Sequence, residues 1–169
     1  MRHRRRLAVV LGINQTMSWG VTFYLPAIIA DPAAHTLHAS PMAVLGAFSW
    51  ALLVTGFCAP RVGRWIDTNG GRGVLSLSVL VLAAGLVLLA AAPGPTMWYA
   101  AWSVLGVGMA LGLYDAAFAT VGTLLGREAG PIITGITLIA GLASTVFWSL
   151  GAGLIGMLGW RGLLLFYAG

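Results

Sequence analysis

Long apolar runs, separated by short gaps that hold most of the charge, dominate this sequence. About 30 Å of hydrocarbon is crossed by roughly 20 residues of α-helix, and a backbone in lipid must satisfy its own hydrogen bonds, which favours helices. Five runs reach that length and a sixth begins near the end: residues 7–30, 41–60, 73–92, 97–125, 131–158 and 162–169. We therefore predict an all-α, polytopic membrane protein with five full transmembrane helices and the start of a sixth.

The composition excludes an ordinary soluble domain. Hydrophobic residues make up 59% of the chain, charged residues only 8%, and the mean hydropathy is +0.94. Soluble domains carry about 25% charged residues, so this chain lacks the polar surface to cover itself. The net charge of +5 does not indicate a nucleic-acid partner, because the basic residues stand beside apolar runs and none of them is lysine.

The distribution of arginines predicts the orientation. Positive charge accumulates on the cytoplasmic side of membrane proteins. With the N-terminus inside, eight arginines lie in the cytoplasm and Arg161 lies outside; the eight are Arg2, Arg4, Arg5, Arg6, Arg61, Arg64, Arg72 and Arg127. The basic head resembles a signal peptide, but a signal core spans about 7–15 residues, fewer than the first run. We expect a multi-pass protein of the inner (plasma) membrane with a cytoplasmic N-terminus.

Several gaps carry helix-boundary signals. Ser40 before Pro41 is typical of a helix start, with serine as the N-cap and proline at the first helical position. Residues 31–40 are expected to be a short polar loop, and residues 63–72 a turn at a membrane face. Gly70 and Gly71 would let that turn adopt positive φ.

The second gap carries the pattern Gly-x-x-x-Asp-x-x-Gly-x-Arg, formed by Gly63, Asp67, Gly70 and Arg72. This pattern resembles the signature of the major facilitator superfamily between its second and third helices. Thr68 and Gly71 stand where that signature usually has basic residues. Gly159-Trp160-Arg161 before the sixth run, and the glycines of the fourth run (Gly106, Gly108 and Gly112), are also similar to what members carry.

The resemblance implies a twelve-helix secondary transporter with two pseudo-symmetric halves that rock about a central site. Residues 1–169 would be its N-terminal transmembrane half, truncated within the sixth helix. The expected partners are a small-molecule substrate, the lipid bilayer and the missing C-terminal half of the same protein. Within the motif, we expect Asp67 and Arg72 to latch one closed state; the alternative is a charged loop that only fixes topology.

Asp115 is the acid that falls inside a predicted span, and an unpaired carboxylate there is costly and functional by default. Counting about 1.5 Å per residue from Met97 places it roughly 27 Å along the helix, near the inner face. This depth favours a pairing with Arg64 or Arg72. Proton coupling is the second role considered.

Polar residues of the first run suggest a cavity. Asn14, Ser18 and Thr22 recur every fourth residue and so share a helical face, with Gln15 on the adjacent stripe. In the family that the chain resembles, the first and fourth helices line the central cavity, which would add Trp102 and Tyr114. The alternatives are hydrogen bonding between packed helices and, for the aromatic residues, an interfacial belt.

The sequence shows no nucleophile–base set, and His35 with His38 alone would make a poor metal site. We therefore expect neither an enzyme nor a protein with a metal or cofactor. The leading hypothesis is a secondary active transporter of a small organic solute, coupled to an ion gradient. Ser18-Trp19-Gly20 loosely resembles monocarboxylate symporters. The alternative is a non-transporting membrane scaffold, or a half-size subunit that assembles with a partner chain.

Overall fold

The computed structural model describes residues 2–169, with side chains described from residue 5 onward, and these residues form helices without any strand. The elements, in chain order, are α1 (Arg2–Trp19), the π-helix η1 (Gly20–Tyr24), α2 (Leu25–Leu37), α3 (Pro41–Asn69), α4 (Gly71–Ala90), α5 (Pro95–Gly112), α6 (Tyr114–Leu125), the 3₁₀-helix η2 (Gly126–Glu128), α7 (Ala129–Ala140) and α8 (Ala143–Ala168). The predicted all-helical class is confirmed.

Within the residues that the structure describes, three helical stretches are long and apolar enough to cross a membrane: Pro41–Asn69, Gly71–Ala90 and Pro95–Ala168. The third is far longer than one crossing and contains the breaks between α5 and α6 and between α7 and α8. Large hydrophobic side chains are widely exposed on the surface; Phe57, for example, is 75% exposed and Met157 82% exposed. A surface of this kind suits lipid and not water.

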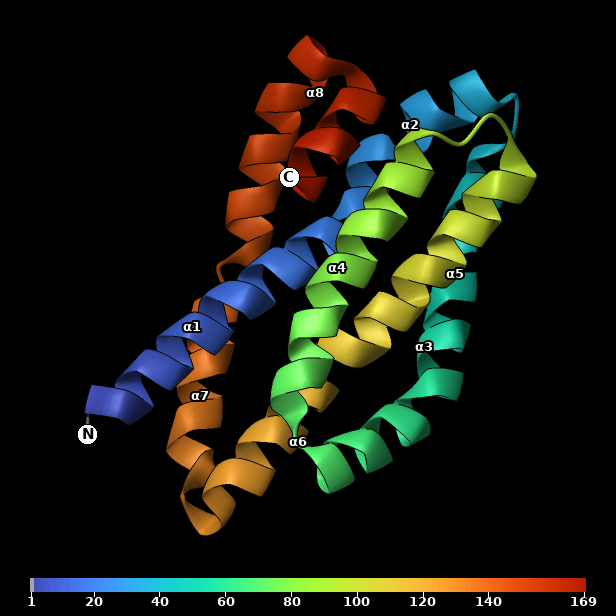
Figure 1. Ribbon diagram of the computed structural model, residues 1–169. Helices are drawn as coiled ribbons and strands as arrows, with labels where there is room; N and C mark the ends of the chain where they lie inside the picture. The colour runs from blue at the N-terminus through green and yellow to red at the C-terminus, as the bar shows by residue number, and fades with distance from the viewer. Residues whose placement is uncertain (1) are drawn as a thin grey trace.

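The centre of the bundle is α5, which packs between α3 and α4 (Figure 1). Close approach of α5 to α3 depends on Gly106, where a Cβ would lie 2.6 Å from the backbone oxygen of Ala51. On the other side, a Cβ on Gly108 would lie 2.7 Å from Leu82 of α4. Small residues at helix crossings are how membrane helices gain packing contacts.

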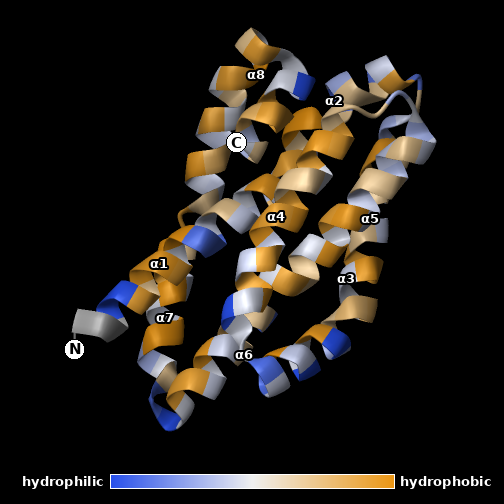
Figure 2. Cartoon of the chain, in the orientation of Figure 1, coloured by the Kyte–Doolittle hydropathy of each residue, from blue (hydrophilic) through white to orange (hydrophobic). Residues whose placement is uncertain are grey.

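The chain alternates between two ends of the bundle. Figure 1 shows the N-terminus, the α3–α4 junction and the α6–α7 turn at the lower end, and the α2–α3 and α4–α5 connections at the upper end. In Figure 2 the hydrophilic colour gathers at the lower junctions, while the bodies of the helices are mostly hydrophobic. Arg64, Arg72 and Arg127 are all exposed near those lower junctions.

Two predicted loops are helical instead. Residues 31–37 continue α2, which ends where His38 adopts φ 51° and its N–H bonds to the oxygen of Ala34. Residues 61–69 continue α3 past Pro60, because Val62 and Ile66, four residues apart, are both buried against neighbouring helices. Figure 1 shows α3 bending toward its lower end, where Pro60 removes one helical hydrogen bond. The predicted N-cap is confirmed: Ser40 accepts a hydrogen bond from the Ala43 N–H at 3.2 Å.

Two predicted spans are interrupted. The run 97–125 is divided at Leu113, which has extended backbone angles (φ −79°, ψ −172°), so it forms two helices, α5 and α6. The run 131–158 begins at Ala129 and is divided at residues 141–142. A further bend at Gly159 (φ 66°) separates the predicted fifth and sixth runs.

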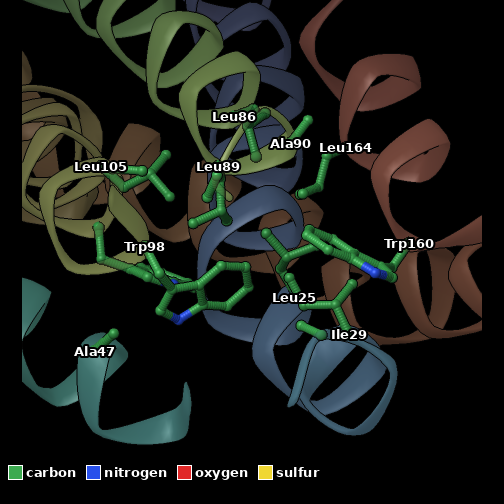
Figure 3. Packing of buried hydrophobic residues seen from close by; sticks show 14 of the residues in the cluster. Leu25, Ile29, Ala47, Leu86, Leu89, Ala90, Trp98, Leu105, Trp160 and Leu164 are labelled. Carbon is green, nitrogen blue, oxygen red and sulfur yellow. The ribbon is translucent and has the colours of Figure 1, made fainter. Parts of the chain in front are cut away.

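The upper half of the bundle has an aromatic core. Figure 3 shows Trp98 of α5 and Trp160 of α8 pointing toward one another beside Leu25 of α2, with ring centroids 5.7 Å apart. The Trp98 indole donates to the oxygen of Val44, and the Trp160 indole donates to the hydroxyl of Thr36. Arg161 donates to the oxygens of Ala90 and Ala92, which ties the end of α8 to the α4–α5 connection.

Candidate functional site

A cavity of about 290 Å³ opens among the end of α1, η1, the middle of α3 and the α5–α6 break. We call it the central cavity. Its lining residues are Trp19, Phe23, Leu52, Thr55, Ala59, Met109, Ala110, Leu113, Tyr114 and Asp115. The lining is mainly aromatic and aliphatic, and Asp115 is its single charged member.

The break between α5 and α6 positions Tyr114 and Asp115. A Cβ on Gly112 would overlap the Ser78 side chain of α4, so α5 can approach α4 closely there. The oxygen of Gly112, left at the end of α5, accepts a hydrogen bond from Gln15 Nε2 at 2.6 Å. Interrupted backbone is tolerated at membrane depth when protein covers it. The break therefore places the first turn of α6, which contains Asp115, at the central cavity.

The π-helical segment positions the aromatic residues of the first helix. Pro26 has no N–H to donate to the carbonyl of Thr22, and its ring excludes a regular turn there. The residues just before it form the five-residue π-helix Gly20–Tyr24, a feature frequent at functional sites. A π-turn changes which residues share a face, so Trp19 and Phe23 face the central cavity, while Gly20 packs against the ring of Phe147.

Aromatic rings continue from the central cavity into the core. The Trp19 ring centroid lies 4.9 Å from that of Tyr114 and 4.3 Å from that of Phe23. Phe23 contacts Phe48 at 5.2 Å, and Phe48 contacts Trp102 at 5.5 Å. The Trp19–Tyr114, Phe23–Phe48 and Phe48–Trp102 contacts join distant parts of the chain, so the rings hold the α1–η1 segment, α3 and the α5–α6 unit in a fixed relation.

Asp115 lies in the first turn of α6, and its side chain is exposed. The helix N-terminus carries a partial positive charge that stabilises a carboxylate. Within residues 5–169, no ion pair joins Asp115 to Arg64 or Arg72, and the predicted pairing with either arginine stays a prediction. The arginines stand on the exposed end of the α3–α4 hairpin, whereas Asp115 faces the central cavity.

The contacts between α4 and the α5–α6 unit give the depth of Asp115. Gly112 packs against Ser78, and Gly71 packs against Thr120. Interpolation between these contacts places Asp115 roughly 7 Å from the Gly71 end of α4, at 1.5 Å per residue. The acid thus lies toward the arginine-bearing end, whereas Thr55, halfway along α3, lies at the middle of the bundle.

A second cavity, of about 170 Å³, lies between α1, α4 and the end of α8. Asn14 and Ser18 line it, together with Tyr167 and apolar residues of α4. Asn14 Oδ1 and the Tyr167 hydroxyl are buried there without a hydrogen-bond partner in the described chain. We call it the minor cavity.

The predicted cavity residues thus divide among three environments. Tyr114 lines the central cavity, and Asn14 with Ser18 lines the minor cavity. The other three are buried in helix packing: Gln15 and Thr22 through hydrogen bonds to backbone oxygens, and Trp102 within the chain of rings. The predicted common face of Asn14, Ser18 and Thr22 does not extend to Thr22, because Thr22 lies within the π-helix, which changes the helical register.

Sequence reasoning missed Phe23 and Thr55. Phe23 follows Trp19 by four residues, a spacing that would have revealed their shared contact. The Thr55 hydroxyl lies 2.9 Å from the oxygens of both Ala51 and Gly106, so it bridges α3 and α5. A lone threonine in an apolar run carries no signal of such a role.

The motif residues lie at the end of the α3–α4 hairpin. Gly63 and Asp67 belong to the last turns of α3, and Arg72 belongs to the first turn of α4. Gly70 has φ 80° and ψ 156°, which confirms the positive φ, but Gly71 has no positive φ and instead packs against Thr120. Asp67 and Arg72 are both exposed, and they form no ion pair with one another within residues 5–169.

The chain matches no family model. Over 107 residues, 62% of this chain, it is 31% identical to a curated protein of Thermoproteus tenax described as "Uncharacterized 38 kDa protein in 23S RNA operon". The chain spans about 29% of the length of that relative.

Proposed function

We propose that this chain belongs to a secondary active transporter of a small organic solute, working by alternating access and driven by an ion gradient. The observation that supports this most is the central cavity, which lies among apolar, membrane-length helices and is bordered by a broken helix and a π-helix. Transporter sites lie near the bilayer midplane and are formed by discontinuous helices.

The proposal includes a topology. The first helix crosses from the cytoplasm, α3 and α4 form the next hairpin, α5–α6 crosses back, and α7 with the first part of α8 is the fifth crossing. The shared location of the arginine-bearing junctions at one end supports a cytoplasmic assignment of that end. The major-facilitator-like motif, Gly63, Asp67, Gly70 and Arg72, lies at the same end.

We propose that this motif acts as a latch together with a second transmembrane half. Asp67 and Arg72 are exposed and unpaired with one another, so both are available to groups outside the described chain. A carboxylate beside a helix N-terminus of the other half would gain a favourable interaction in one closed state. Asp67→Asn would then change the balance between inward-open and outward-open states.

Transport by the full-length protein tests the function. Purified protein is reconstituted into vesicles, and uptake of a panel of small organic cations, anions and neutral solutes is measured with and without a proton or sodium gradient. The neighbouring residues Leu52 and Leu53 supply a matched pair, because Leu52 lines the central cavity whereas Leu53, 58% exposed, does not.

We expect gradient-dependent uptake of at least one solute, abolished by Leu52→Trp and retained in Leu53→Trp. Equal uptake by the two variants would contradict a role for the central cavity. Absence of uptake across the panel would favour the scaffold or half-size subunit instead.

A further inference from the structure

We propose that the central cavity selects an organic cation that carries an apolar or aromatic group. The inference rests on the proposed function and names the class of solute. It comes from the juxtaposition of a single carboxylate, Asp115, with the rings of Trp19, Phe23 and Tyr114 in one cavity.

The charge of the central cavity is negative and comes from Asp115. Among the ten lining residues, no arginine or histidine accompanies Asp115. Within residues 5–169 no ion pair neutralises this carboxylate, although Arg64 and Arg72 lie toward the same end of the bundle. An unpaired carboxylate in a largely apolar site gains most from a cation that enters with the ligand.

The aromatic rings supply the second requirement for a cation. Ring faces attract cations within about 6 Å of the centroid, and tryptophan does so best. Trp19 and Tyr114 come from different helices and lie 4.9 Å apart at an interplanar angle of 44°. Tyr114 is also stacked on Phe118 at 4.9 Å and 14°, which restricts its rotation. The rings are therefore held in place before a ligand binds.

The same geometry disfavours a monocarboxylate. The N-terminus of α6 would by itself attract an anion, but Asp115 already places negative charge in that first turn. A second carboxylate beside it would be repelled, because both groups carry negative charge. The remaining surface, from Leu52, Met109 and Leu113, suits the apolar part of the ligand.

Equilibrium binding to the full-length protein tests the inference. The protein is placed in nanodiscs of zwitterionic lipid, which avoids attraction of cations to the membrane itself. The probes are benzyltrimethylammonium as the cation and phenylacetate as the anion, two small solutes that both carry a benzyl group. The variants are Asp115→Asn, which removes the charge at nearly constant shape, and Asp115→Glu, which keeps it.

Asp31→Asn is the matched control, because Asp31 is an exposed carboxylate on α2, away from the cavity. We expect wild type to prefer benzyltrimethylammonium over phenylacetate, and Asp115→Asn to weaken binding of the cation by about tenfold or more. Asp115→Glu and Asp31→Asn should bind it within about threefold of wild type. Trp19→Leu should weaken cation binding, and Trp19→Phe should restore most of it.

Equal affinity of wild type and Asp115→Asn for the cation would overturn the inference, as would preferential binding of phenylacetate. Size-exclusion profiles and helical circular dichroism identify variants that fail to fold. If Asp115→Asn fails to fold, the affinity of Asp115→Glu for the cation is compared with that of wild type, and a loss of affinity in Asp115→Glu would overturn the inference. Gradient-driven uptake of phenylacetate without the cation would overturn this inference and leave the proposed function standing. Asp115-dependent binding of the cation without any transport would support the inference and contradict the proposed function.

Discussion

Individual glycines in this chain have different structural roles, which the structure distinguishes. Gly70 has a backbone conformation that side chains rarely adopt, Gly106 and Gly71 allow close helix approach, and Gly56 faces open space. The turn glycine can be predicted, because it follows a charged helix end. The glycines that allow close helix approach cannot be predicted, because the atoms they contact lie on another helix. Thr120, which packs against Gly71, is far along the chain.

Gly70→Ala should destabilise the protein. With φ 80° and ψ 156°, this position lies in a region open essentially to glycine, and an alanine there costs about 1–3 kcal/mol. Thermal unfolding in detergent should show a lower midpoint. Gly73→Ala is the control, because a Cβ there meets no atom within 4 Å inside helix α4. An unchanged midpoint for Gly70→Ala would contradict the backbone assignment.

Gly106→Ala should separate α3 from α5. The added Cβ would lie 2.6 Å from the backbone oxygen of Ala51, which cannot move without the helix, and overpacking of this kind costs about 1–3 kcal/mol. Gly56→Ala on α3 has open space around its Cβ and should be neutral or slightly stabilising. The free energies of unfolding of Gly106→Ala and Gly56→Ala are measured in mixed detergent and compared. Equal effects would mean that α3 and α5 do not pack at Gly106.

At the scale of whole helices, the hydropathy pattern predicted where apolar helices lie better than where they end or break. Ser40 and Pro41 marked a boundary that the structure confirms, because the signal is local. No proline marks the break at Leu113 in the sequence. The break depends on Gln15, almost a hundred residues earlier, which donates a hydrogen bond to the oxygen of Gly112 at the end of α5. Residues 31–37 stay helical because Ala33, Ala34 and Leu37 are buried, although their polar neighbours suggested a loop.

Gln15→Met should loosen the break between α5 and α6. The change keeps side-chain volume but leaves the Gly112 oxygen without its buried donor, which costs about 1–3 kcal/mol. Hydrogen exchange should then become faster at residues 113–116. Thr134→Val is the control, since its exposed hydroxyl bonds only within α7. If exchange at the break does not change, the Gln15 hydrogen bond does not hold it.

Arg161→Met should release the end of α8 from the α4–α5 connection. Arg161 donates to the oxygens of Ala90 and Ala92 and stacks on Trp160, with its guanidinium carbon 4.2 Å from the ring centroid. Hydrogen bonds from a charged group contribute about 1.5–3 kcal/mol, so the unfolding midpoint should fall. Arg127→Met, at an exposed arginine, should have little effect. Equal midpoints would contradict the anchoring role.

At the scale of the whole molecule, the proposed function depends on one proposed arrangement: apolar helices that cross a membrane in alternating directions around the central cavity. Composition and arginine placement sufficed to predict an all-helical protein with membrane-length apolar helices whose hydrophilic residues gather at one end. The cavity could not be predicted as a unit, because Trp19, Thr55 and Asp115 come from distant parts of the sequence. Their meeting depends on the π-helix before Pro26 and on the α5–α6 break, and the break has no local signal in the sequence.

Cysteine accessibility in intact cells tests this arrangement most directly. Cys58, the single cysteine of residues 1–169, and any cysteine outside these residues are first replaced by serine. Single cysteines are then placed at Asn69 and Arg127 at the lower junctions, and at His38 and Thr96 at the upper ones, and treated with a membrane-impermeant thiol reagent. We expect labelling from outside at positions 38 and 96, and labelling at 69 and 127 only after the cells are opened. Labelling of position 69 together with position 38 from outside would contradict the alternating crossings and the transporter proposed from them.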